Sequence, residues 1–241
     1  IGEEFYSEVG GVTSVETFVF HDRESAFDKA VLKRLKRADG IFIAGGDQSR
    51  YVRYCRGTPI EDALNAHVAA GKPLGGTSAG LAIQGEYLYG AMVGGSQNSS
   101  AALFDPRGSD NTIENDFLTI PLLKGVLTDT HFSERNRLGR LIAFVAKAET
   151  LAGRPLIGLG VDEDAALAVD ADGKARVYAT APQAGASVVY GGWPESPEDV
   201  AMNLDVVEVR GAGVNSTLHL PSGRIENPAF ERRYAVRDGV L

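Results

Sequence analysis

Gly76-Thr77-Ser78-Ala79-Gly80 follows a short apolar approach, Pro73-Leu74-Gly75, and precedes a segment, Leu81-Ala82-Ile83, that can begin a helix. A Gly-x-Ser-x-Gly run between a strand and a helix is typical of a nucleophile elbow, because small flanking residues let the chain turn sharply and present the serine hydroxyl above the sheet. The helix behind it offers backbone N–H groups to an oxyanion. Ser78 is therefore a candidate nucleophile. Clusters of Gly, Ser and Ala also form ordinary strand-to-helix turns, so the pentapeptide alone leaves both interpretations open.

Around this turn, apolar runs and helical periodicity alternate along the chain. Helical spacing of apolar residues marks segments 24–37 and 60–70, and short apolar runs predict strands at 15–20, 40–44, 73–75, 126–129 and 156–161. Continuous apolar runs suit strands that are covered on both faces. The alternation predicts an α/β fold of three layers, with a mostly parallel sheet and helices on both faces.

Two regions depart from this alternation. Residues 90–115 are rich in Gly, Ser, Asn and Asp and lack periodicity, which predicts a long loop near the site. Residues 166–241 are rich in Val and contain turn signals, so we expect β-hairpins that close one edge of the sheet. We interpret residues 1–241 as a single domain with this β-rich C-terminal extension.

Composition excludes several classes of protein. The 241 residues are 44% hydrophobic and carry a formal net charge of −8, which argues against a surface that binds nucleic acid. One cysteine, Cys55, permits neither an intrachain disulfide nor a thiolate metal site. The sequence has neither an apolar run long enough to span a membrane nor a signal-peptide pattern in residues 1–20. It begins with Ile1, so a processed or truncated product is expected, and both cytoplasmic and secreted locations stay open.

A base for Ser78 can be sought among four histidines. His21 follows a predicted strand end, and His67 lies in a helical stretch. His219 lies in the predicted hairpin region. His131 stands just beyond the strand at 126–129, at the edge where ligands collect in open α/β sheets. A histidine there can reach a neighbouring serine as a general base, although a lone loop histidine is also often structural.

The residues around His131 favour the catalytic interpretation. Arg135, Arg137 and Arg140 follow within nine residues of it. Their spacing does not fit one helix face, so at least one is expected to point towards the cleft, where its planar guanidinium suits bidentate binding of a carboxylate. A solvated, charged helix start is the alternative.

Together these motifs resemble the cyanophycinase and aspartyl dipeptidase family of serine peptidases, and most closely its cyanophycinase-like branch. The matching segments are Gly45-Gly46-Asp47-Gln48, Gly76-Thr77-Ser78-Ala79-Gly80, Asp129-Thr130-His131-Phe132-Ser133-x-Arg135-x-Arg137-x-Gly139-Arg140-Leu141 and Gly160-Val161-Asp162-Glu163-x-Ala165. The resemblance implies a flavodoxin-like core related to class I glutamine amidotransferases. It implies Ser78 as nucleophile, His131 as base, and the N–H groups of Gly46 and Ala79 as the oxyanion hole. It also implies substrate contacts from Gln48, Asp129, Arg135, Arg137 and Arg140.

Two departures from the family pattern stand out. The resemblance leads us to expect an acidic residue between the serine and the histidine, but the corresponding stretch, residues 94–102, contains no carboxylate. The favoured substitutes that could orient His131 are Asp105 and Glu114. Further acidic candidates are Glu86 and Asp116, and the neutral alternatives are Gln97 and Asn98. The family's first strand and its Gly-rich turn also have no counterpart, so we expect the chain to begin after them.

The sequence thus predicts a serine exopeptidase that needs no metal or other cofactor and hydrolyses a peptide or poly-aspartyl substrate of the β-Asp-Arg type. The alternatives are an α-aspartyl dipeptidase and a non-catalytic relative that keeps the pocket as a binding module. We expect no nucleic-acid or membrane partner, and the sequence leaves a homodimer open.

Overall fold

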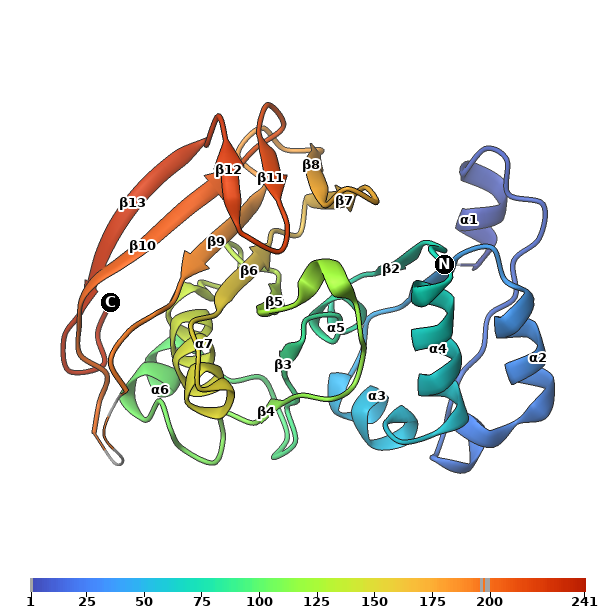
Figure 1. Cartoon of the computed structure of the whole chain (residues 1–241), viewed down its shortest axis with the longest axis horizontal. Coiled ribbons are helices and arrows are strands. Elements are labelled where there is room, and N and C mark those ends of the chain that lie inside the picture. Colours follow the sequence, from blue (N-terminus) through green and yellow to red (C-terminus); the bar gives the residue numbers. More distant parts are fainter. Residues whose placement is uncertain (1, 196, 198–199) are drawn as a thin grey trace.

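The computed structural model describes residues 2–195, 197 and 200–241. Its N-terminal third surrounds a two-stranded parallel sheet with helices (Figure 1). The elements are α1 (Gly2–Glu8), the 3-10 helix η1 (Glu24–Phe27), α2 (Lys29–Arg37), β1 (Ile41–Ile43), α3 (Gln48–Cys55), α4 (Pro59–Ala69), β2 (Leu74–Gly76) and α5 (Ala79–Ala82).

The middle of the chain supplies the centre of a second, larger sheet. Its elements are β3 (Tyr87–Tyr89), α6 (Ser99–Phe104), β4 (Ile113–Glu114), the 3-10 helix η2 (Pro121–Leu123), β5 (Val126–Thr130), α7 (Leu138–Ala152) and β6 (Ile157–Val161). Strands β3, β5 and β6 are parallel neighbours. The predicted loop at 90–115 therefore contains a short helix and a short strand, which local composition did not indicate.

The C-terminal third is all β. It contains β7 (Ala165–Val169), β8 (Lys174–Ala179), β9 (Ala186–Tyr190), β10 (Leu204–Ala212), β11 (Thr217–His219), β12 (Arg224–Glu226) and β13 (Phe230–Val236). Strands β9, β10 and β13 extend the larger sheet to the order β13-β10-β9-β6-β5-β3-β4, and the other four form a separate antiparallel sheet. The predicted hairpins thus extend one edge of the sheet and also cover a face of it.

The seven-stranded sheet is buried on both faces. Val189 of β9 packs with Phe144 and Val145 of α7 on one face, whereas Val188 packs with Leu218 of the four-stranded sheet on the other. Leu81 of α5 joins this second cluster. Burial of alternate residues on opposite faces explains why the strand sequences are continuously apolar. The predicted α/β class, with a parallel centre, packed helices and C-terminal β-hairpins, is confirmed.

One predicted strand is wrong. Residues 12–20 have no regular secondary structure, and Val19 is 69% exposed. Its alternating sequence suits a strand, but within the described residues no neighbouring strand pairs with it, so its backbone groups have no ladder to join. The predicted helix at 24–37 is divided, because Asp28 accepts hydrogen bonds from the N–H groups of Ala30 and Val31 and so begins α2.

The two parallel regions meet through side chains. Among the described residues, β1 and β2 form no ladder hydrogen bonds with the seven-stranded sheet. Thr128 of β5 bridges them: its hydroxyl donates to the carbonyl oxygen of Ala82 at 3.0 Å and accepts from the N–H of Gly85 at 3.1 Å. The elbow is therefore fixed against β5 by a hydroxyl. None of the described helices is both long and apolar enough to cross a membrane.

Candidate active site

Ser78 lies in a strained turn between β2 and α5. Its φ is 52° and its ψ is −120°, a region that residues with a side chain rarely adopt. The turn is tight because Gly80 packs directly on the end of β1, where a Cβ atom would come within 2.6 Å of the carbonyl oxygen of Ala44. The two glycines of the motif thus permit a close approach of backbone that any larger residue would prevent.

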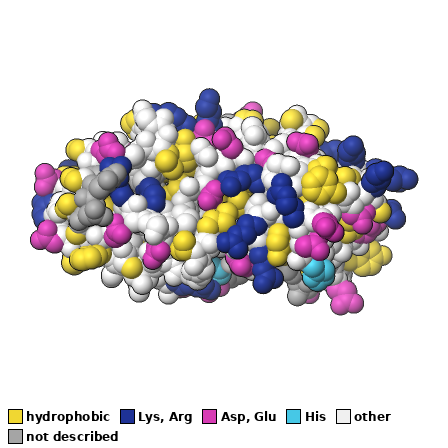
Figure 2. Space-filling view, turned by 90° about the horizontal axis from the view of Figure 1, so that it is seen from below, with side chains coloured by type: hydrophobic (Ala, Val, Ile, Leu, Met, Phe, Trp, Pro, Cys, Tyr) yellow, Lys and Arg dark blue, Asp and Glu magenta, His cyan; other side chains and the backbone are white. Residues whose placement is uncertain are grey.

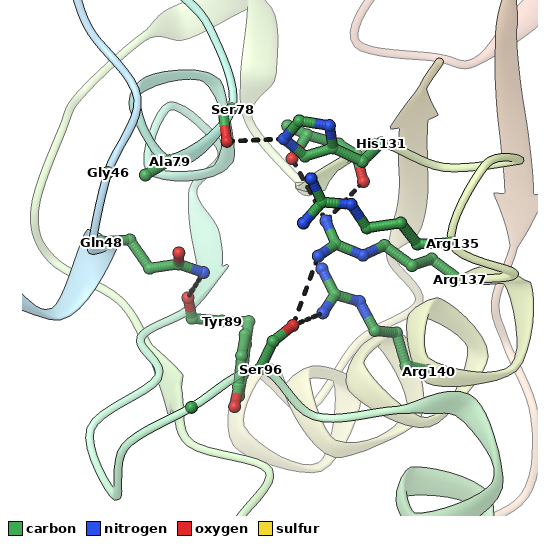
Figure 3. A pocket seen from close by; sticks show the side chains of 12 residues that line it. Gly46, Gln48, Ser78, Ala79, Tyr89, Ser96, His131, Arg135, Arg137 and Arg140 are labelled. Carbon is green, nitrogen blue, oxygen red and sulfur yellow. Dashed lines mark hydrogen bonds between the residues drawn. The ribbon is translucent and has the colours of Figure 1, made fainter. Parts of the chain in front are cut away.

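His131 follows the last residue of β5 and faces this turn. Its Nε2 atom lies 2.7 Å from the Ser78 hydroxyl oxygen (Figure 3). His131 itself has a positive φ of 48°, which is maintained on its C-terminal side by the hydrogen bond from the Phe132 N–H to the carbonyl oxygen of Val161, at 3.2 Å. This geometry allows Nε2 to take the hydroxyl proton when the serine attacks.

The other ring nitrogen of His131 contacts a carboxylate. Nδ1 lies 2.5 Å from Oε1 of Glu163, which directly follows Asp162 at the end of β6. The ring hydrogen bond lowers the pKa of the Glu163 carboxyl, and the charges of His131 and Arg135 act in the same direction. The carboxylate therefore stays ionised at neutral pH and fixes the tautomer that leaves Nε2 free to accept.

The expected acids at Asp105 and Glu114 are wrong for this position. Glu114 pairs with Arg56 at 2.6 Å, and Asp105 lies at the C-terminal end of α6, where its carboxylate adjoins Gly108. The neutral alternatives are also occupied elsewhere: Asn98 accepts from the N–H of Ala101 to begin α6, and Gln97 accepts from the N–H of Asn98.

A signal for Glu163 was present in the sequence. Strands β5 and β6 are parallel, with Thr130 opposite Val161, so the residues that follow each strand emerge at the same edge. Asp162 strengthens this alignment, because its two carboxylate oxygens accept from the N–H groups of Ser133 at 3.0 Å and Gly185 at 2.9 Å. The Gly160-to-Ala165 segment is one of the motifs that carry the family resemblance, although the sequence alone gives its carboxylates no role.

Two backbone N–H groups adjoin Ser78. Gly46, with a φ of 136°, and Ala79, the first residue of α5, both line the same cavity as the serine. Within the described part of the chain, neither N–H has a hydrogen-bond acceptor. The hydroxyl of Tyr51 holds the loop in place through a 2.7 Å hydrogen bond to the carbonyl oxygen of Ala44. Two unpaired donors beside a nucleophile are the arrangement that stabilises an oxyanion.

The cavity beside Ser78 has a volume of about 120 Å³ and a polar lining (Figure 3). Residues from four parts of the chain line it: Gly46, Gln48, Ser78, Ala79, Tyr89, Gly95, Ser96, Thr130, His131, Arg135, Arg137 and Arg140. Gln48 donates through Nε2 to the carbonyl oxygen of Tyr89 at 3.1 Å, which leaves its Oε1 as the acceptor on this wall. Sequence reasoning did not identify Tyr89 or Ser96, which come from β3 and the loop after it.

All three arginines reach the cavity, but they differ in what binds them. Arg140 is 2% exposed, and its guanidinium contacts the carboxylate of Asp129, including an Nε to Oδ2 hydrogen bond of 2.7 Å. Asp129 is equally buried, so its expected role as a substrate contact is wrong. Its two oxygens are used by Arg140 and by the N–H of Thr130, and Asp129 positions Arg140 instead.

Arg137 is also buried, at 7% exposed, and its Nη1 lies 3.7 Å from Oδ1 of Asp129, whereas Arg135 is exposed. Arg137 donates to the carbonyl oxygen of Thr130 at 2.7 Å, and burial lowers its pKa to about 10, so that it remains charged at neutral pH. The Arg135 side chain is 52% exposed, and among the residues that the structure covers its one ion pair is a 3.4 Å approach of Nη2 to Oε1 of Glu163. Arg135 and Arg137 precede α7, which is why all three side chains can converge despite a spacing that no helix face accommodates.

Comparison with known proteins agrees with this geometry. Residues 11–177 match peptidase family S51. Proteins named cyanophycinase from Synechococcus elongatus and Trichormus variabilis are 38% and 32% identical over 168 residues, which is 69% of this chain and 47% and 51% of theirs. The chain thus spans about half the length of the curated relatives it matches.

A solved structure supports the fold. The crystal structure of a peptidase from an acI-B1 Actinobacterium superposes with a TM-score of 0.51 at 20% identity, covering 82% of this chain and 66% of that one. The family match covers most of the chain and includes Ser78, His131 and Glu163. The chain belongs to peptidase family S51.

Proposed function

We propose that this chain is a serine hydrolase that cleaves the amide bond next to an aspartyl unit. One observation carries the proposal: Ser78, His131 and Glu163 form a continuous chain of hydrogen bonds of 2.7 and 2.5 Å. A nucleophile, a base and a carboxylate that orients the base are the three parts that acyl transfer by serine requires.

In the proposed reaction, the Ser78 oxygen attacks the substrate carbonyl carbon and His131 takes the hydroxyl proton on Nε2. The negative charge that develops on the carbonyl oxygen is stabilised by the N–H groups of Gly46 and Ala79. His131 then gives its proton to the departing amine, which breaks the amide bond and leaves an ester on Ser78. Water attacks this ester with His131 again as base, and the free serine is restored.

The cationic wall of the cavity supports an acidic substrate. Arg137 and Arg135 lie beside Ser78 and suit the carboxylate of an aspartyl unit, while Gln48 presents an acceptor to an N–H group of the substrate. The relatives at 38% and 32% identity are named cyanophycinases, which favours β-aspartyl-arginine peptides as the substrate class. The same cationic wall would also suit the carboxylates of an α-aspartyl dipeptide, so an aspartyl dipeptidase is the second candidate.

A fluorophosphonate probe and a β-aspartyl-arginine dipeptide test the proposal. The probe is expected to label Ser78, and Ser78→Ala is expected to abolish both labelling and hydrolysis while leaving the melting temperature nearly unchanged. Ser100→Ala is the matched control, because Ser100 lies on α6 outside this cavity. Equal residual turnover in the wild type and Ser78→Ala would instead support a non-catalytic binding module. A faster reaction with a longer β-aspartyl-arginine polymer than with the dipeptide would exclude the dipeptidase.

A further inference from the structure

Ser96 is a cavity residue with an unusual set of partners. It lies in the loop between β3 and α6, and its hydroxyl oxygen is 2.9 Å from Nη1 of Arg140 and 3.3 Å from Nη2 of Arg137 (Figure 3). A guanidinium has only N–H donors, so the Ser96 oxygen must be the acceptor in both contacts. Both lone pairs of the hydroxyl are therefore occupied.

The Ser96 hydroxyl can still donate one hydrogen bond. A serine hydroxyl has one proton and two lone pairs, so only the O–H of Ser96 remains available. In the part of the chain that the structure describes, no acceptor receives this proton, and Ser96 lines the cavity that contains Ser78. Two neighbouring cations also polarise the O–H bond, which makes the group a stronger donor.

We propose that Ser96 is a specificity-determining residue whose hydroxyl donates to the free carboxylate of the aspartyl unit, beside Arg137. The proposal rests on the proposed function for the identity of the ligand. An oriented donor next to a buried cation recognises a carboxylate, which accepts from both, and discriminates against a carboxamide, whose NH₂ group would oppose one of the two donors. The loop that carries Ser96 thereby becomes part of the substrate-reading wall, together with the arginines that hold it.

Ligand binding to a variant that cannot turn over its substrate tests the role of Ser96 directly. In a Ser78→Ala background, calorimetry would compare β-aspartyl-arginine with the same dipeptide in which the free aspartyl carboxylate is a carboxamide. Ser96→Ala is expected to weaken binding of the carboxylate ligand about tenfold and that of the carboxamide about twofold or less. Ser96→Thr, which keeps a hydroxyl, is expected to restore the preference, and Ser100→Ala is expected to leave both affinities unchanged.

Three results would overturn the proposal. Ser96→Ala could weaken the binding of both ligands equally, which would mean that Ser96 acts only by holding Arg137 and Arg140. It could change neither affinity, or neither ligand could bind in any variant. Failure of the proposed function looks different: the wild type would resist fluorophosphonate labelling of Ser78 while the Ser78→Ala protein still preferred the carboxylate ligand through Ser96.

Discussion

Glu163→Gln is the substitution that most sharply tests the catalytic geometry. A glutamine is almost the same size, but its NH₂ group can face Nδ1 of His131 and so stabilise the tautomer that places a proton on Nε2, towards Ser78. In a serine triad the equivalent amide costs about 10⁴ in kcat. Glu163 Oε1 lies 2.5 Å from Nδ1, but the side chain is 42% exposed, so water and rotation of the amide can replace part of the contact.

We therefore expect Glu163→Gln to lower kcat/KM for β-aspartyl-arginine by about 10²- to 10³-fold, with most of the effect in kcat. The rate of fluorophosphonate labelling at Ser78 should fall in parallel, because both reactions need the same base. Asp164→Asn is the matched control: Asp164 is the next residue and contacts Thr180 instead. A folded Glu163→Gln protein that loses less than tenfold in both reactions would refute the role given to this carboxylate.

The remaining predictions concern acid stability, the buried ion pair, the elbow and the end of β6. The hydrogen bond from His131 lowers the Glu163 pKa below its ordinary value of 4.5 in the folded state, so this carboxylate stabilises the fold above that pH and the stabilisation is lost as the pH falls through the lowered pKa. The difference in Tm between wild type and Glu163→Gln should therefore shrink as the buffer is made more acidic than pH 4.5, and a difference that stays the same there would contradict this contact. Asp129→Ala leaves Arg140 buried without its partner and should cost about 3–5 kcal/mol of unfolding free energy in a urea titration; a loss below about 1 kcal/mol would contradict the buried pair. Gly80→Ala should abolish labelling of Ser78, because the added Cβ forces the turn away from β1; normal labelling would show that the elbow is looser than described. Asp162→Asn replaces an acceptor of two N–H groups with one that can satisfy only one of them, so kcat should fall about tenfold while KM stays nearly constant; an increase in KM alone would argue against this positioning role.

Local sequence predicted the parts of the molecule that depend on neighbouring residues. The elbow needs small residues at fixed positions around Ser78, and the strand that precedes it begins in a short apolar run, so both can be predicted from the sequence. His131 was identified because it follows a strand end, which is also a local property.

What the sequence could not supply depends on pairing between distant segments. Glu163 reaches His131 only because β6 lies parallel to β5 in a register that aligns their ends, and register is set by packing. Ser96 lies in a stretch whose local composition indicates no contact, because its hydrogen bonds with Arg137 and Arg140 depend on the path of the connection between β3 and α6. The segment 15–20 has the alternation of a strand, but a strand exists only where a partner is hydrogen-bonded to it.

The hydroxyl of Thr128 joins α5 to β5, so the distance between Ser78 and His131 depends on how the two sheets are aligned. Ser78 follows a strand of the two-stranded sheet, whereas His131 and Glu163 follow strands of the seven-stranded one, and the two sheets are joined through side chains and α5. Figure 2 shows one outer face of this joined body, where charged and apolar groups are intermixed. A relative slide of the sheets by about 1 Å would cost few of the contacts that hold each sheet together, yet it would stretch the 2.7 Å approach of Ser78 to His131 beyond the reach of proton transfer. The proposed activity would thus depend on the fit of one sheet against the other, a property that can be lost while every strand remains folded.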